Sequence, residues 1–140
     1  MKFSEPTILL VDDCKEDRLL LTQALAEAGL EFKIDEASDA AEAELYISRK
    51  LSQDAVPHLI ILDMNLPKRS GLELLDSWHA QGFTQLTRII VLSSVLPEGE
   101  ISKLRALGAL RVFEKPLDLQ EFSRLGKHVK ELATLSTVGA

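Results

Sequence analysis

The chain has 140 residues and a mass of 15.5 kDa, which is the size of one compact domain. Its residues are 46% hydrophobic and 27% charged, and this composition excludes a disordered or fibrous protein. It carries 16 basic and 22 acidic residues, and the resulting net charge of −6 repels phosphate backbones and anionic membranes. We therefore expect neither nucleic acid nor a membrane as a direct partner.

No part of the sequence is typical of export or membrane insertion. The first six residues, Met1 to Pro6, lack the apolar stretch of a signal peptide. No segment approaches the roughly 20 apolar residues that a membrane span needs. The one cysteine, Cys14, has no second cysteine with which to form an internal disulfide. These features predict a cytoplasmic protein.

Short apolar runs of strand length alternate with helical patterns along the chain. Strands are predicted at 7–11, 32–35, 59–62, 89–92 and 111–113. Helices are predicted at 16–28, 39–51, 71–81, 97–107 and 119–133. Two helix starts carry capping-box patterns, formed by Ser70 with Glu73 and by Asp118 with Glu121. The alternation of strands and helices predicts an α/β fold.

Two of the predicted strands contain continuous apolar runs, at 8–11 and 59–62, which suit strands buried on both faces of a helix-covered parallel sheet. We therefore expect a doubly wound five-stranded parallel sheet in the flavodoxin-like order 2-1-3-4-5, with helices on both faces. No repeat or Pro/Gly/Ser-rich linker interrupts the pattern. Residues 1–140 are thus expected to form a single domain with a core at about 7–133, short tails and no separate output domain.

Polar side chains follow four of the five predicted strands, at the edge where open α/β sheets bind ligands. They are Asp12 and Asp13 after the first strand, Asp63 after the third, Ser93 and Ser94 after the fourth, and Lys115 with Pro116 after the fifth. The first and third strands are neighbours in the expected order, so we expect Asp12, Asp13 and Asp63 to converge on one cleft.

Three carboxylates so close together repel one another, and at neutral pH they need a cation or a proton to coexist. Mg²⁺ is the natural candidate, because it prefers hard oxygen ligands and is often shared with a phosphate oxygen. Lys115 adds a positive charge and Ser93 a hydroxyl donor from the neighbouring strands. A phosphoryl group is the ligand that uses a metal, an ammonium and a hydroxyl together, and an aspartate can act as its nucleophile.

These residues resemble the receiver domain of two-component response regulators, over nearly the whole chain from about Thr7 to Ala133. Four motifs carry the resemblance: Asp12-Asp13, the segment 62–71 (Leu-Asp-Met-Asn-Leu-Pro-Lys-Arg-Ser-Gly), Ser93-Ser94 and Lys115-Pro116. The sequence Asp-Met-Asn-Leu-Pro at 63–67 also resembles that of the small regulators that are paired with bacterial phytochrome-type kinases.

The resemblance implies that Asp63 accepts a phosphoryl group from a phosphohistidine on a sensor histidine kinase or a phosphotransfer protein. It also implies a Mg²⁺ site formed by Asp13, Asp63 and the backbone carbonyl of Asn65, with Asp12 acting through water. Such a protein is a phosphoacceptor that loses its own phosphoryl group slowly at most, and not an enzyme. Its output would pass through a downstream protein that the sequence does not name, and the sequence leaves a homodimer open.

The same resemblance places Ser93, Ser94 and Lys115 in the region that binds the phosphoryl group and switches in response to it. The Lys115–Pro116 peptide bond is usually cis in the family. One position departs from the family pattern: Val112 stands where a switching Tyr or Phe is usual, three residues before the lysine. Phe113 follows it, but alternation along a strand points this ring to the opposite face.

Three other functions are compatible with an α/β fold that carries acidic residues at this edge. A phosphatase of the haloacid dehalogenase type also uses a strand-end aspartate, but its general acid stands two residues later, where this chain has Asn65. A nucleotide-binding module would need a glycine- or hydroxyl-rich loop after the first strand, and residues 12–16 are acidic instead. A receiver fold that serves only as a phosphorylation-independent adaptor is the remaining alternative, and the intact acidic set with Lys115 argues against it.

Overall fold

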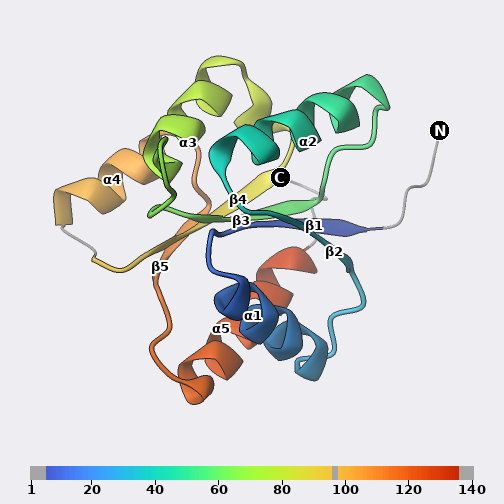
Figure 1. Cartoon of the computed structure of the whole chain (residues 1–140), viewed down its shortest axis with the longest axis vertical. Coiled ribbons are helices and arrows are strands. Elements are labelled where there is room, and N and C mark those ends of the chain that lie inside the picture. Colours follow the sequence, from blue (N-terminus) through green and yellow to red (C-terminus); the bar gives the residue numbers. More distant parts are fainter. Residues whose placement is uncertain (1–5, 96–97, 136–140) are drawn as a thin grey trace.

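The computed structural model describes residues 6–95 and 98–135, which form one five-stranded parallel sheet in the order β2-β1-β3-β4-β5 (Figure 1). The strands are β1 Thr7–Val11, β2 Lys33–Ala37, β3 Leu59–Asp63, β4 Arg88–Ser93 and β5 Arg111–Glu114. The α-helices are α1 Lys15–Glu27, α2 Ala40–Ser52, α3 Gly71–Ala80, α4 Glu98–Ala106 and α5 Leu119–Ala133, with a short 3₁₀ helix η1 at Phe83–Gln85. The predicted α/β fold and its strand order are confirmed.

Helices cover both faces of the sheet. Helices α1 and α5 lie on one face, and α2, α3 and α4 lie on the other (Figure 1). Ser70 and Asp118 cap α3 and α5 as predicted, since each side chain accepts a hydrogen bond from the backbone N–H three residues later, at 3.2 Å and 2.8 Å. Within residues 6–95 and 98–135, no helix has the length and apolar character to cross a bilayer.

The predicted elements differ from the observed ones only at their ends. Strand β2 lies at Lys33–Ala37 rather than at 32–35, because it pairs residue for residue with the whole of β1. Strands β3, β4 and β5 each extend one residue further toward their carboxyl ends, to Asp63, Ser93 and Glu114. The predicted start of the fourth helix, Pro97, lies outside the described residues.

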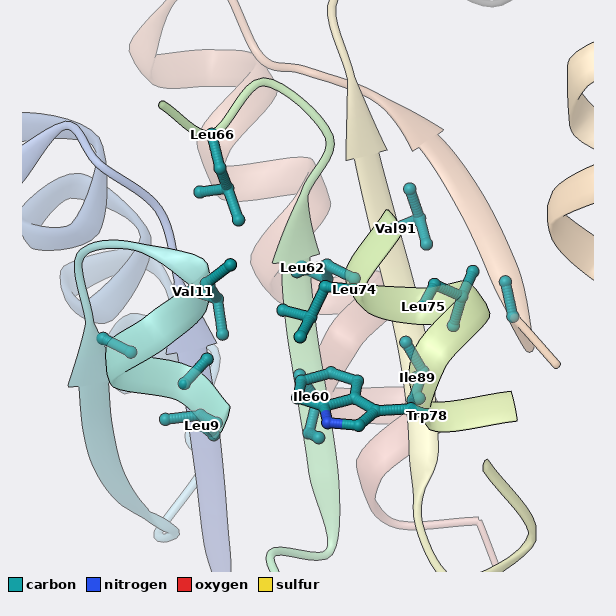
Figure 2. Packing of buried hydrophobic residues seen from close by; sticks show 14 of the residues in the cluster. Leu9, Val11, Ile60, Leu62, Leu66, Leu74, Leu75, Trp78, Ile89 and Val91 are labelled. Carbon is teal, nitrogen blue, oxygen red and sulfur yellow. The ribbon is translucent and has the colours of Figure 1, made fainter. Parts of the chain in front are cut away.

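The core is divided by the sheet into two apolar layers, because successive side chains of a strand point to opposite faces. In β1, Leu9 and Val11 belong to the layer beneath α2 and α3, whereas Ile8 and Leu10 belong to the layer beneath α1 and α5. Figure 2 shows the first of these layers, in which Trp78 lies across the sheet. These four side chains are buried, so the strand cannot slip by one residue without exposing or misplacing them.

Helices α1 and α5 approach each other closely at Gly126. A Cβ atom at this position would lie 2.7 Å from the carbonyl oxygen of Ala24 and 3.0 Å from the Ala24 Cβ. Helix α1 follows Asp12 and Asp13 in the chain, and helix α5 follows Lys115. The close contact between the two helices therefore helps to hold these polar residues at a fixed separation.

Replacing Gly126 by alanine is expected to lower the free energy of unfolding by about 1–3 kcal/mol, because the added methyl group forces the two helices apart. Urea unfolding followed by circular dichroism measures this change. Gly99→Ala is the matched control: Gly99 is exposed in α4 and a Cβ there would meet nothing within 4 Å. The control is expected to be neutral or stabilising by up to about 1 kcal/mol. Equal stability of Gly126→Ala and the parent would contradict the prediction.

Candidate functional site

Three carboxylates converge at the carboxyl ends of β1 and β3. Asp12, Asp13 and Asp63 each place one oxygen within 4.8 Å of the others, and we call these three residues the acidic cluster. Asp12 and Asp63 are buried, with 3% and 1% of their surfaces exposed, whereas Asp13 is exposed. The predicted convergence is confirmed, and the cluster opens to solvent on the Asp13 side.

The backbone after β3 fixes the orientation of Asp63. The N–H of Asn65 donates to Asp63 Oδ1 at 3.0 Å, and the N–H of Met64 donates to the carbonyl of Leu92 in β4 at 2.9 Å. Helix α3 then begins against this turn, because Gly71 has no side chain: a Cβ there would lie only 2.5 Å from the Asp63 carbonyl oxygen. The turn leaves Asp63 Oδ2 directed toward Lys115.

Lys115 supplies the positive charge of the site. Its Nζ lies 2.9 Å from Asp63 Oδ2. The backbone of Lys115 is held in place because its N–H donates to the Ser93 carbonyl at 2.8 Å. Its Nζ is also 3.2 Å from Asp17 Oδ2 and 3.5 Å from Asp12 Oδ2. Burial alone would lower the pKa of Lys115, but the carboxylates around it raise the pKa above its ordinary value, so it stays a cation.

Asp12 is the carboxyl group whose ionisation the site disfavours. Its pKa is raised from an ordinary value of 3.8 to about 6, first because burial penalises the charged form and further because Asp63 is negatively charged. The N–H of Cys14, which donates to Asp12 Oδ1 at 2.8 Å, and the charge of Lys115 partly offset this rise. An additional cation beside Asp12 would therefore stabilise its charged form.

The serines at the end of β4 lie on the opposite side of the site from β1. Ser93 Oγ donates to the carbonyl of Val95 at 2.6 Å, so its hydroxyl is bonded within its own loop. Asn65 Nδ2 donates to Ser94 Oγ at 2.9 Å, and this contact joins the β3–α3 turn to the β4–α4 loop. The structure thus brings Asn65 and Ser94 together, a pairing that the sequence analysis did not foresee.

Two features around β5 concern the predicted switch. Val112 packs against the layer beneath α2 and α3, and Phe113 packs against the layer beneath α1 and α5, as alternation predicted. The Lys115–Pro116 bond is trans, so the expectation of a cis bond drawn from the family is wrong for this structure. The physical reason is the small energy difference between the isomers before proline, about 0.5–1 kcal/mol, which local packing decides.

Asp17 and Arg18 also belong to the site, although the sequence analysis missed both. Asp17 contacts Lys115 from the first turn of α1, and Arg18 Nη1 donates to the carbonyl of Asp12 at 2.6 Å. Arg18 Nε also pairs with Glu36 of β2 at 2.9 Å. The available signal is that Asp17 and Arg18 stand at the start of the predicted helix that directly follows Asp12 and Asp13, close to the carboxyl end of β1.

The donor set fits a hard divalent cation. The acidic cluster offers carboxylate oxygens alone, two of them on buried residues, and such oxygens are the ligands that Mg²⁺ and Mn²⁺ accept. The pKa of Asp12 is raised chiefly by burial and further by the negative charge of Asp63, and a cation in the cluster would offset both effects. The cluster can therefore hold a metal ion, with Asp13 on its open side.

Comparison with known proteins identifies the family. The family model described as response regulator receiver domain matches residues 8–125. The chain belongs to this family. It is 29% identical over 114 residues to the probable chemotaxis protein CheY of Rhizobium etli, an alignment that covers 81% of this chain and 84% of that protein.

Solved response regulators share the fold. The phosphorylated cyanobacterial phytochrome response regulator RcpA is 28% identical, with a TM-score of 0.82 over 95% of this chain and 98% of RcpA. The Mn²⁺-bound form of response regulator Rcp1 is 23% identical, with a TM-score of 0.78 over 94% of this chain and 97% of Rcp1. Some curated relatives are much longer: the chain spans 30% of one that is 37% identical over 113 residues.

Replacing Asp12 by asparagine is expected to stabilise the metal-free protein at pH 8 by on the order of 2–3 kcal/mol. The folded state binds the Asp12 proton more tightly than the unfolded chain, since the pKa rises from 3.8 to about 6. The parent therefore loses stability as the pH rises through this window, whereas the variant does not, and the difference should vanish below about pH 4. Urea unfolding at several pH values, in the presence of a chelator, measures the difference in the free energy of unfolding between the variant and the parent.

The control for this prediction is Asp76→Asn, which changes an exposed carboxylate of α3. Its effect on stability should be small, because an exposed carboxylate interacts only weakly with other charges. If the free energies of unfolding of Asp12→Asn and the parent differ by the same amount at pH 4 and at pH 8, the raised pKa of Asp12 is contradicted.

Proposed function

We propose that the protein is a phosphoacceptor response regulator, which receives a phosphoryl group on Asp63 from a histidine kinase or a phosphotransfer protein. One observation carries the proposal: Asp63 is a buried strand-end carboxylate that belongs to the acidic cluster and lies 2.9 Å from the Lys115 ammonium. Such a pairing of a nucleophilic carboxylate with fixed positive charge suits phosphoryl transfer, in which positioning and charge neutralisation provide most of the catalysis.

The transfer is a displacement at phosphorus. A carboxylate oxygen of Asp63 attacks the phosphorus of a phosphohistidine, the P–N bond breaks as the new P–O bond forms, and the imidazole leaves with the electron pair and takes up a proton. The product is an acyl phosphate on Asp63. Lys115 would pair with the phosphoryl oxygens, and the Ser93 hydroxyl would exchange the Val95 carbonyl for one of these oxygens.

A bound Mg²⁺ would neutralise negative charge on the phosphoryl oxygens. Asp13, Asp63 and the backbone carbonyl of Asn65 are the proposed ligands, with Asp12 acting through water. Two solved relatives support this part of the proposal, since RcpA is known in a phosphorylated form and Rcp1 in a Mn²⁺-bound form. The oxygen-only donor set of the acidic cluster supports it independently.

We propose no enzymatic turnover beyond slow loss of the protein's own phosphoryl group. A neutral residue, Asn65, stands two positions after Asp63, where an aspartate-nucleophile phosphatase needs a general acid. The output is proposed to be a change in the protein surface that a downstream protein recognises. The contact between Asn65 and Ser94 joins the phosphoacceptor turn to the β4–α4 loop, and so provides a route for that change.

Asp63→Asn is expected to abolish phosphorylation, because an amide cannot form an acyl phosphate. The parent, incubated with phosphoramidate and Mg²⁺, should gain one phosphoryl group by intact-protein mass spectrometry, and the variant should gain none. Asp76→Asn should be labelled like the parent. Full labelling of Asp63→Asn would refute Asp63 as the acceptor.

Magnesium binding is expected to be weak without phosphate and to depend on Asp13, because a mostly hydrated ion gains little from a few carboxylates. Titration of the metal-free protein with MgCl₂ should shift the backbone amide resonances near Asp12, Asp13 and Asp63. In Asp13→Ala these shifts should require at least about tenfold more Mg²⁺, by comparison with other metal-site changes. An unchanged titration curve for Asp13→Ala would show that the ligand assignment is wrong.

A further inference from the structure

Asp17 places a fourth carboxylate beside the acidic cluster without belonging to it. It lies in the first turn of α1, and its Oδ2 atom is 3.2 Å from Lys115 Nζ. Its side chain is 28% exposed and that of Lys115 is 17% exposed, so the pair is partly shielded from solvent. Its oxygen is not among the three grouped within 4.8 Å of one another. Asp17 therefore contacts the lysine of the site from outside the proposed metal ligands.

Lys115 shares its ammonium among three carboxylates. An ammonium has three N–H donors, and the neighbours of Lys115 are Asp63 at 2.9 Å, Asp17 at 3.2 Å and Asp12 at 3.5 Å. Two of these neighbours belong to the acidic cluster. A divalent cation that enters the cluster repels the ammonium and competes with it for the oxygens of Asp63 and Asp12. Asp17 lies outside the cluster, so a cation bound there would leave the Asp17 oxygens available to Lys115.

We propose that Asp17 is a positioning residue that holds the Lys115 ammonium beside the site while a divalent cation takes the oxygens of the acidic cluster. This inference rests on the proposed function, because it concerns how the same site is loaded before phosphoryl transfer. Without the Asp17 carboxylate, the described partners of Lys115 are the two cluster residues, so an entering cation displaces an ammonium with no other carboxylate beside it. Asp17 thereby makes loading with metal easier and keeps Lys115 within reach of the incoming phosphoryl group.

A carboxylate at this position also has two effects that do not involve Lys115. An acid in the first turn stabilises a helix through the helix dipole, and any nearby negative charge attracts a cation at long range. Glu16 lies in the same turn of α1, carries the same charge and is exposed. Glu16→Gln is therefore a matched control that removes both general effects and leaves the contact between Asp17 and Lys115 intact.

The first experiment titrates Mg²⁺ into Asp17→Asn, Glu16→Gln and the parent, each near 0.15 M salt, and follows the backbone amides of Asp13 and Asn65 by NMR. The Mg²⁺ dissociation constant should rise by about three- to fivefold in Asp17→Asn and by less than about twofold in Glu16→Gln. Asp17→Glu should stay close to the parent, since one more methylene still lets its carboxylate reach the flexible ammonium. Equal changes in Asp17→Asn and Glu16→Gln would overturn the proposal.

The second experiment repeats the comparison in a Lys115→Met background, which keeps an apolar stem and removes the ammonium. If Asp17 acts through Lys115, Asp17→Asn should then change the Mg²⁺ dissociation constant no more than Glu16→Gln does. If Asp17→Asn still raises the Mg²⁺ dissociation constant by about three- to fivefold in this background, Asp17 acts directly on the cation and the proposal is wrong.

Labelling separates this inference from the function on which it rests. If phosphoramidate labels the parent on Asp63 but Asp17→Asn and Glu16→Gln have equal Mg²⁺ dissociation constants, only the role of Asp17 is overturned. A parent that is not labelled would overturn the proposed function and this role together.

Discussion

The ammonium of Lys115 makes it possible for the buried ends of two strands to carry negative charge side by side. Asp12 and Asp63 are almost fully buried, and like charges in such surroundings are costly unless a cation is paired with them. Lys115 follows β5 and reaches both carboxylates across the end of β4, and its charge offsets part of the repulsion. Part of the cost remains, because burial, and then the charge of Asp63, still raise the pKa of Asp12, and a divalent cation beside these carboxylates would offset both effects.

The two-layered core explains why this arrangement can be maintained. Strands β1, β3 and β4 are apolar on both faces, so their register is fixed by packing from above and below. Their carboxyl ends are therefore held in place before any ligand arrives. The polar groups sit on this edge with few degrees of freedom left, and such preorganisation is what phosphoryl transfer requires of a protein.

The sequence is sufficient to predict those parts of the site that depend only on where strands end. Asp63 follows a continuous apolar run, and the strand order then places it beside Asp12. The contact between Asp17 and Lys115 is not predictable in this way, because it depends on the rotation of α1 about its axis and on the path of the chain after β5. The isomer of the Lys115–Pro116 bond is equally beyond a sequence argument, since an energy difference of about 0.5–1 kcal/mol separates the two forms.

The single tryptophan of the chain has an unusual position for an optical probe of such a site. Trp78 is 2% exposed, meets the ring of Phe83 edge-on at 5.4 Å, and lies across Ile60 and Ile89, near the starts of β3 and β4 (Figure 2). The acidic cluster is at the other end of these strands. Trp78 fluorescence should consequently respond when water enters the core and remain constant when a cation binds to the intact protein. The chain thus carries an intrinsic reporter of unfolding that is separate from its ligand chemistry.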